Sequence, residues 1–254
     1  MRRRNRLDAA NAIVSLACLA CSEVTGDFDR VIAIQLPLPL VASVEEGDTT
    51  TLQAQALRAS GEIVPDAQIV WAIIDVDSGQ IGFTIDTASG LIRGTHPGSG
   101  RVQARLENEN LRSDPLLVTV TPAPDSMSAV SATRLLTAAM AEQSPPLTVR
   151  VLDLTSQDTP VGLAGKQVSY SIVVPANATG IFLTVTDTVP QADRSELTVI
   201  SGATGDASAF LRRVPGEIQP DSAVVEVSAN TAAGQLVAGS PIRFVVEFEP
   251  AGTN

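Results

Sequence analysis

Apolar and polar residues alternate in short runs along most of the chain, a pattern typical of half-buried β-strands. The clearest example is residues 83–104, in which Phe83 and Ile85 alternate with polar neighbours before the turn residues 86–90. A second extended run follows, then a turn rich in Gly and Pro at 95–100, and then a third alternating run. The pattern predicts three consecutive strands joined by two tight turns.

Similar runs predict strands in both halves of the chain, at residues 31–34, 50–57, 69–74, 101–106, 116–121, 147–153, 161–172, 203–211, 223–229 and 242–248. Residues 134–143 contain good helix formers and fit either a short helix or an irregular first strand. Apolar residues make up 44% of the chain but aromatic residues only 3%, so Val, Ile, Leu and Ala must fill the cores. With 18 Gly and 16 Pro as turn residues, this composition favours many short strands.

Residues 83–104 also contain a specific motif. It reads hydrophobic-Asp-x-x-Ser-Gly-Leu-hydrophobic-x-Gly-x-x-Pro-Gly, and its marker residues are Asp86, Gly90, Gly94, Pro97 and Gly98. The motif resembles that of the bacterial immunoglobulin-like group 2 repeat. The resemblance implies an immunoglobulin-like sandwich over residues 30–122, with Trp71, the only tryptophan, buried on its third main strand.

The second half resembles the bacterial immunoglobulin-like group 1 repeat of intimin- and invasin-type adhesins. The matching positions are Val149, Val151, Asp153, Pro160, Val161, Val168, Gly205, Ala207, Leu211, Val227 and Ala229. The chain departs from that repeat by an insertion at Pro175–Ser195 and by a weak first strand. The resemblance implies a second sandwich over 127–250, with a tail at 251–254. The linker 123–126, rich in proline, should hold the two domains at a defined angle.

The N-terminal residues predict export. A basic start is followed by an apolar stretch at 9–20, which is too short to span a bilayer and fits a signal peptide over 1–20. The ending resembles a bacterial lipobox, which implies a lipidated Cys21, with Cys18 as the second choice and a tether over 21–29. The alternative is a plain cleaved signal peptide with incidental cysteines. The fold class we predict is therefore all-β, with two tandem immunoglobulin-like β-sandwich domains after an N-terminal signal and anchor segment.

The net charge is −11, which argues against nucleic acid or an anionic membrane surface as the main partner. We expect contact with the membrane through the lipid anchor only. The predicted location is exported and membrane-anchored, facing the periplasm or the cell surface. The predicted partners are envelope proteins, among them an integral membrane complex. Lys166 is the only lysine, and we interpret this bias toward arginine as a property of genome composition.

The residues that support catalysis are scarce. His96 is the only histidine, so a Ser-His-acid triad or a multi-histidine metal site cannot form within one chain. Both cysteines lie in the N-terminal segment, which excludes a thiol site in the folded body. Asp75 and Asp77 precede a glycine and faintly resemble a calcium loop, although we favour an ordinary turn. We predict a non-enzyme without cofactor or metal.

One edge of the first domain offers a contact surface. Pro37 and Pro39 exclude a central strand, so the segment belongs at a sheet edge. Its apolar residues form the predicted leucine strip, which consists of Leu36, Leu38, Leu40 and Val41. The alternative is a plain edge strand that crosses between sheets.

These observations predict a non-enzymatic, lipid-anchored envelope protein whose two domains serve as an interaction scaffold. It would act either as a surface adhesion module or as an accessory subunit of a membrane complex on its periplasmic side. The alternative is a carbohydrate-binding module or small glycosidase, for which Trp71 and Tyr170 are the only aromatic platforms that we identify.

Overall fold

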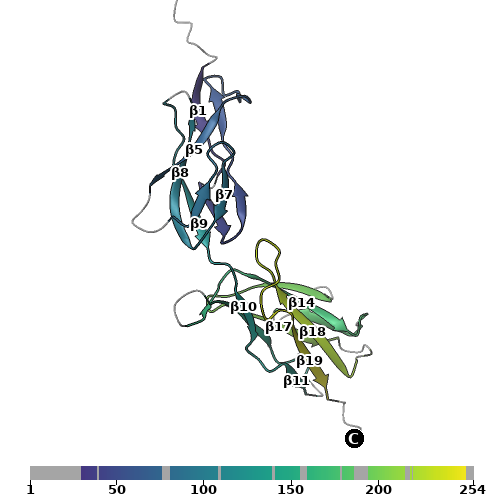
Figure 1. Cartoon of the computed structure of the whole chain (residues 1–254). Helices are drawn as coiled ribbons and strands as arrows, with labels where there is room; N and C mark the ends of the chain where they lie inside the picture. Colours follow the sequence, from purple (N-terminus) through teal and green to yellow (C-terminus); the bar gives the residue numbers. More distant parts are fainter. Residues whose placement is uncertain are drawn as a thin grey trace, which may run out of the picture.

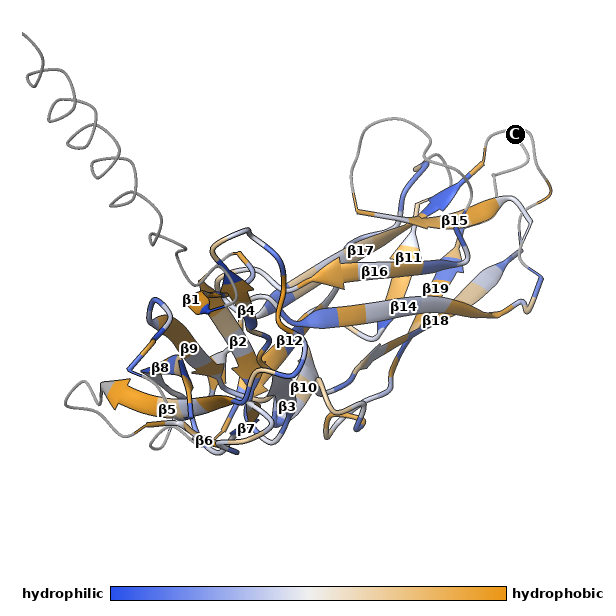
Figure 2. Ribbon diagram, turned by 90° about the horizontal axis from the view of Figure 1, so that it is seen from above, coloured by the Kyte–Doolittle hydropathy of each residue, from blue (hydrophilic) through white to orange (hydrophobic). Residues whose placement is uncertain are grey.

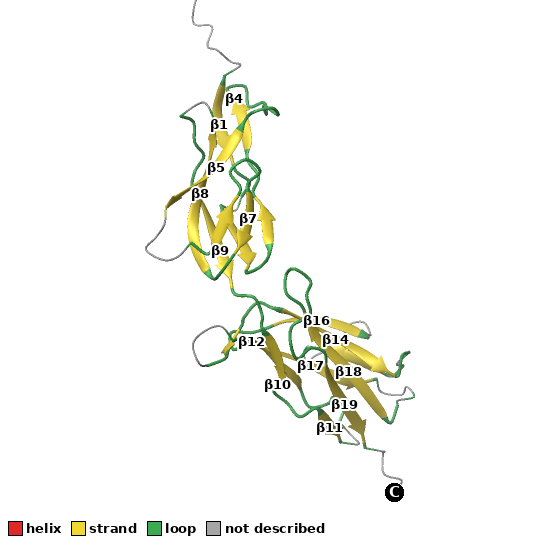
Figure 3. Cartoon of the chain, viewed as in Figure 1, coloured by secondary structure: helices red, strands yellow, loops and turns green. Residues whose placement is uncertain are grey.

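The computed structural model describes residues 30–38, 40–75, 81–107, 110–138, 141–154, 159–177, 179–185, 194–214, 218 and 220–249. All regular elements within these ranges are β-strands, arranged as two sandwiches that lie end to end (Figure 1, Figure 3). The predicted all-β class is confirmed.

The described part of the first domain contains strands β1–β9 in two layers. One layer is a sheet in the order β2 (Val41–Glu45), β9 (Leu116–Thr121), β8 (Gly98–Leu106) and β5 (Ile69–Asp75). The other layer contains the sheet β3 (Thr49–Thr51), β7 (Leu91–Gly94) and β6 (Phe83–Ile85), together with the pair β1 (Val31–Gln35) and β4 (Gln55–Arg58). β2 runs parallel to β9, and the other strand pairs are antiparallel.

The described part of the second domain contains strands β10–β19. One sheet has the order β10 (Ser126–Ala129), β12 (Leu147–Asp153), β17 (Asp206–Arg213) and β15 (Ile181–Thr184), and β13 (Val161–Gly162) also pairs with β12. The other has the order β11 (Arg134–Thr137), β19 (Ile242–Phe248), β18 (Ser222–Ala229), β14 (Gln167–Val174) and β16 (Glu196–Ile200). Both domains therefore have the two-sheet architecture of immunoglobulin-like sandwiches.

The motif at residues 83–104 forms β6, β7 and β8, as predicted. Its first turn is closed by Asp86, whose Oδ1 accepts hydrogen bonds from the backbone N (2.7 Å) and Oγ (2.6 Å) of Ser89. These bonds lower the pKa of the Asp86 carboxyl. Gly90 ends the turn with φ +70°, and a Cβ there would lie 2.5 Å from Nε1 of Trp71. The turn thus needs glycine both for its backbone angle and for the space that the indole occupies.

Each domain buries one large polar aromatic residue on the equivalent strand. Trp71 on β5 is 3% exposed and pairs across the sheet with Ala104, so its predicted burial is confirmed. Tyr170 on β14 is fully buried, and its Oη donates to the carbonyls of Ala207 (2.7 Å) and Leu147 (3.2 Å) in the opposite sheet. Burial raises the pKa of the Tyr170 hydroxyl well above its ordinary value.

Several segments differ from the simplest reading of the sequence or settle an alternative that it left open. The strands β2, β10 and β16 are not predicted by the sequence pattern. The strand predicted at 50–57 is divided into β3 and β4, because the chain changes partner from β7 to β1 between them. Residues 134–137 form a strand rather than a helix, and that strand, β11, runs parallel to β19. The insertion at Pro175–Ser195 contains the short strand β15, whose apolar residues appear orange in Figure 2.

Candidate functional site

The predicted site residues are scattered, and some lie outside the described part of the chain. Cys18 and Cys21 lie outside it, as does Asp77, and the side chain of Asp75 is not described. Among the described residues, no group of three or more His, Cys, Asp or Glu side chains is placed to hold a metal ion. Nor does the described part of the chain contain a helix long and apolar enough to cross a membrane.

The leucine strip is divided between core and surface. Leu36 is 8% exposed and belongs to the first core cluster, whereas Leu38 is 84% exposed. Leu40 is half-buried, and Val41 is 52% exposed. Only Leu38 and Val41 therefore present a large apolar surface to solvent, and the side chain of Leu36 is unavailable for contact.

His96 lies in the turn that precedes β8. Its Nδ1 is 3.1 Å from Oγ1 of Thr95, while its Nε2 is buried without a hydrogen-bond partner. Its ring is half-buried. Among the described residues no carboxylate is bonded to the ring, so it lacks the orienting acid that a catalytic histidine needs.

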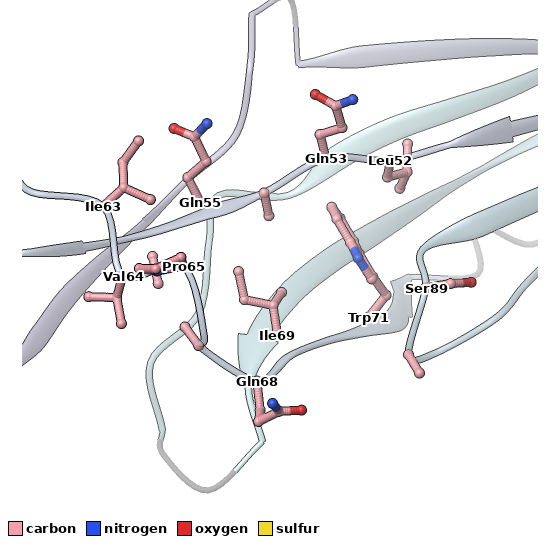
Figure 4. A pocket seen from close by; sticks show the side chains of 14 residues that line it. Leu52, Gln53, Gln55, Ile63, Val64, Pro65, Gln68, Ile69, Trp71 and Ser89 are labelled. Carbon is pink, nitrogen blue, oxygen red and sulfur yellow. The ribbon is translucent and has the colours of Figure 1, made fainter.

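A groove of about 500 Å³ opens beside Trp71 in the first domain. The described residues that line it, drawn in Figure 4, include no ionisable side chain. The amide groups of Gln53 and Gln55 point away from the indole. Because Trp71 is 3% exposed and Tyr170 fully buried, neither ring can stack on a sugar from solvent. This groove therefore lacks the residues that hydrolysis or aromatic sugar binding would require.

The second groove, of about 810 Å³, lies between the two domains. Its lining comes from the end of β2, the linker, the turn before β14 and the loop after β18. At its centre Nζ of Lys166 donates to Oε2 of Glu45 at 2.5 Å and to the carbonyl of Pro122 at 2.7 Å. The other carboxylate oxygen of Glu45 accepts a hydrogen bond from the backbone N of Ala232 at 2.8 Å. We call these four residues the clasp.

The clasp joins the two domains, at the start of the linker, through two charged side chains. Glu45 ends β2 of the first domain, Pro122 lies directly before the linker, and Lys166 and Ala232 belong to the second domain. The side chains of Lys166 and Glu45 are each 11% exposed. Charge-assisted bonds in such a partly desolvated place are stronger than those at an open surface. The only lysine of the chain thus has a specific structural position between the two domains.

A motif glycine makes room for this clasp. A Cβ on Gly94 would lie 2.6 Å from the backbone carbonyl of Glu45, so only glycine allows β2 to approach β7 this closely. The backbone N of Gly47 donates to the carbonyl of Gly94 at 3.0 Å, which fixes the turn after β2. The motif that specifies the first sandwich therefore also positions the residue that reaches the second.

The other perturbed ionisable groups have structural causes. The hydrogen bonds that Nε and Nη2 of Arg150 donate to Asp206 (2.6 and 3.0 Å) lower the pKa of that carboxyl, and they raise the pKa of Arg150. This pair bridges β12 and β17 on a surface that is open to solvent. Its geometry is that of an ordinary cross-strand ion pair rather than an acid–base site.

Comparison with known proteins adds little beyond this architecture. No protein-family model matches the chain, so the resemblances to the group 2 and group 1 repeats remain predictions. No curated protein matches it either.

Several solved structures are similar in part. The chain is 16% identical to the adhesin InvE of Yersinia pseudotuberculosis over 85% of this chain and 58% of that one, with a TM-score of 0.39. The chain is 15% identical to the Escherichia coli adhesin FdeC over 88% of this chain and 66% of that one, with a TM-score of 0.40. It is 16% identical to the D00-D0 domain of intimin over 85% of this chain and 98% of that one, with a TM-score of 0.28. The chain thus spans about three fifths of InvE, and likenesses this weak transfer no function to it.

Proposed function

We propose that the chain is a non-enzymatic scaffold of a bacterial cell envelope, in which two immunoglobulin-like domains are held at a fixed angle and offer edges and loops to protein partners. The observation that supports this most directly is the clasp, in which Lys166 and Glu45 connect the two domains. A rigid two-domain body suits a spacer or an interaction platform.

The proposal includes export and a lipid anchor at Cys21, with the domains as relatives of the group 2 and group 1 repeats. The sequence at the N-terminus supports the anchor, because the apolar stretch ends directly before a cysteine. Replacing Cys21 by Ser should release the protein from the membrane fraction and abolish labelling by a radioactive fatty acid. Cys18→Ser is the matched control and should change neither. Unchanged fractionation of the Cys21→Ser variant would contradict the anchor.

The scaffold has two versions, a surface adhesion module and an accessory subunit of a membrane complex. Crosslinking in intact cells distinguishes them, and the chemistry of the crosslinker matters here. Amine-reactive reagents are unsuitable because the only lysine is held in the clasp. A carboxylate-directed reagent can use the 28 Asp and Glu residues instead.

The outcomes of that experiment are distinct. A single envelope protein captured in constant stoichiometry supports the accessory subunit. Digestion of the chain by protease added outside intact cells supports the adhesion module. A chain that neither crosslinks to an envelope protein nor is reached by the protease contradicts both versions.

A further inference from the structure

The strand β16 forms an open edge of the second domain. It is the last strand of the five-stranded sheet and pairs with β14 in an unbroken register from Glu196 to Ile200. The side chains of Glu196, Thr198 and Ile200 are exposed, and that of Ile200 retains 55% of its surface. Between them, Leu197 is buried and Val199 packs partly against the core.

The hydrogen bonds at both ends of β16 show which backbone groups point outward. The carbonyl of Ser195 accepts a bond from the N of Ile172 (2.9 Å), and the N of Ser201 donates to the carbonyl of Lys166 (2.8 Å). Successive residues of an antiparallel strand face alternate sides, so odd-numbered residues bond to β14. Arg194, an even-numbered residue, fits this alternation, because its carbonyl points away from β14 and accepts a hydrogen bond from the backbone N of Leu183.

The backbone groups of Glu196, Thr198 and Ile200 therefore point away from the sheet. Within the described residues, β16 pairs with no strand other than β14. Three donors and three acceptors thus form a ladder that is ready to receive another strand.

Two other edges of the protein, β10 and β5, are covered. On β10, the backbone N of Met127 donates to the carbonyl of Ala238 at 2.8 Å. On β5, the N of Trp71 donates to the carbonyl of Thr87 at 2.8 Å, and the register is interrupted between Ile73 and Asp75. Within the described residues, the outward backbone groups of Glu196, Thr198 and Ile200 have no such cover. β16 also has no bulge and neither lysine nor proline, which are the usual protections of an edge strand.

We propose that β16 is a self-association site, at which a second copy of this chain adds its own β16 in antiparallel orientation about a two-fold axis at Thr198. In this register Thr198 faces the partner's Thr198, and Glu196 faces the partner's Ile200. The outward N–H and C=O groups of each strand then lie opposite those of the partner strand, residue for residue. The two sheets become one continuous ten-stranded sheet.

The chemistry of the strand favours a second copy as the occupant. Glu196 is the only charged residue of β16, and the two-fold register keeps the two carboxylates about 14 Å apart along the strands. Facing threonines form a favourable cross-strand pair. The net charge of −11 opposes association electrostatically, and salt screens that repulsion. Dimerisation should therefore strengthen as the salt concentration rises.

Analytical ultracentrifugation of the full chain tests the association and its centre. We expect a monomer–dimer equilibrium whose dissociation constant falls with added salt. Thr198→Lys places two like charges opposite each other and should raise that constant at least about tenfold. Thr198→Val, the matched control, keeps a β-branched side chain and should change it little. A chain that is monomeric at all concentrations, or a dimer that tolerates Thr198→Lys, overturns the proposal.

Disulfide trapping tests the register in a chain carrying Cys18→Ser and Cys21→Ser, which has no other thiol. Thr198→Cys should form a crosslinked dimer on oxidation, since Cα atoms of a hydrogen-bonded pair lie about 5.5 Å apart, within disulfide range. Glu196→Cys and Ile200→Cys should not crosslink alone but should crosslink when mixed. Failure of both expected crosslinks overturns the proposed register, and circular dichroism of each variant confirms that it is folded.

Discussion

Replacing Lys166 by Met should open the joint between the domains while leaving each sandwich folded. Methionine keeps most of the aliphatic stem of lysine but removes the ammonium group. The change therefore deletes the bonds to Glu45 and to the carbonyl of Pro122. Glu45 keeps one donor, the backbone N of Ala232.

The expected loss of stability of the closed joint follows from these contacts. Hydrogen bonds to charged groups contribute about 1.5–3 kcal/mol each, and deletion leaves the Glu45 carboxylate, whose side chain is 11% exposed, without its cation. Against this, holding the lysine side chain in place costs up to about 2 kcal/mol of rotamer entropy, a cost that the variant no longer bears. The net loss for the closed joint is therefore about 1–4 kcal/mol, or roughly 5- to 700-fold in the equilibrium between closed and open joint.

Hydrogen exchange at a single amide measures this equilibrium. The N–H of Ala232 donates to Glu45 across the joint, so its protection depends on closure. In the same loop, the N–H of Gly234 donates to the carbonyl of Thr231 at 2.9 Å and depends only on the local turn. We expect the protection of Ala232 to fall by the factor given above in Lys166→Met, while that of Gly234 stays unchanged.

The control variant is Arg243→Met, which removes an exposed ion pair with Glu226 in the same domain. Exposed pairs contribute about 0–1 kcal/mol, and neither residue of this pair belongs to the clasp, so the protection of Ala232 should not change. The reasoning is refuted if Ala232 keeps its protection in Lys166→Met. It is also refuted if Gly234 loses protection equally, because the loop rather than the joint would then have loosened.

Three further substitutions test the two cores. Trp71→Ala should lower the free energy of unfolding of the first domain by about 3–5 kcal/mol in urea titrations, and a melting-temperature shift under about two degrees would contradict its burial. Gly90→Ala should also destabilise that domain, because its φ is +70° and the added Cβ meets the indole; wild-type stability would show that the turn adapts. The raised pKa of the buried Tyr170 hydroxyl means that stability is complete below the ordinary tyrosine pKa of about 10 and is lost as pH rises above it. Tyr170→Phe should therefore remove this alkaline loss, and absorbance at 295 nm follows the ionisation directly because Tyr170 is the only tyrosine.

The parts of the fold that the sequence predicts correctly are those specified by neighbouring residues. The turn at Asp86–Gly90 is such a case, since a carboxylate that accepts bonds from Ser89 and a glycine with positive φ are local requirements. The burial of Trp71 is instead implied by the resemblance to the group 2 repeat, because its strand is apolar at every position from Ile69 to Ile74 and shows no alternation. Only the turn could be predicted from its own residues.

Two strands lack such local evidence: β15 is not predicted, and β11 is left open between a helix and a strand. β15 reads Ile-Phe-Leu-Thr and is buried along its whole length, so it shows no alternation of apolar and polar positions. β11 is only four residues long and is held by pairing with β19, more than a hundred residues later in the chain. Its residues favour a helix as readily as a strand, and the tertiary partner decides between them.

The clasp illustrates the same limit for function. Glu45 and Lys166 are separated by 121 residues, and neither has a neighbour in sequence that indicates its role. The one available indication was that Lys166 is unique, but uniqueness alone does not distinguish a selected contact from a composition bias. Only the structure shows that this single ammonium group lies where two domains and a linker meet.

The clasp and the open edge are close in the structure but can be tested independently. The backbone N of Lys166 donates to Oγ of Ser201, the residue that follows β16, while its side chain reaches the first domain. Lys166→Met leaves that backbone bond in place, and Thr198→Lys changes only an outward side chain. If the joint and the self-association site are independent, the effects of the two substitutions on the free energy of dimerisation should add within about 0.5 kcal/mol. A larger deviation would mean that pairing at β16 alters the turn before β14, and hence the angle between the two domains.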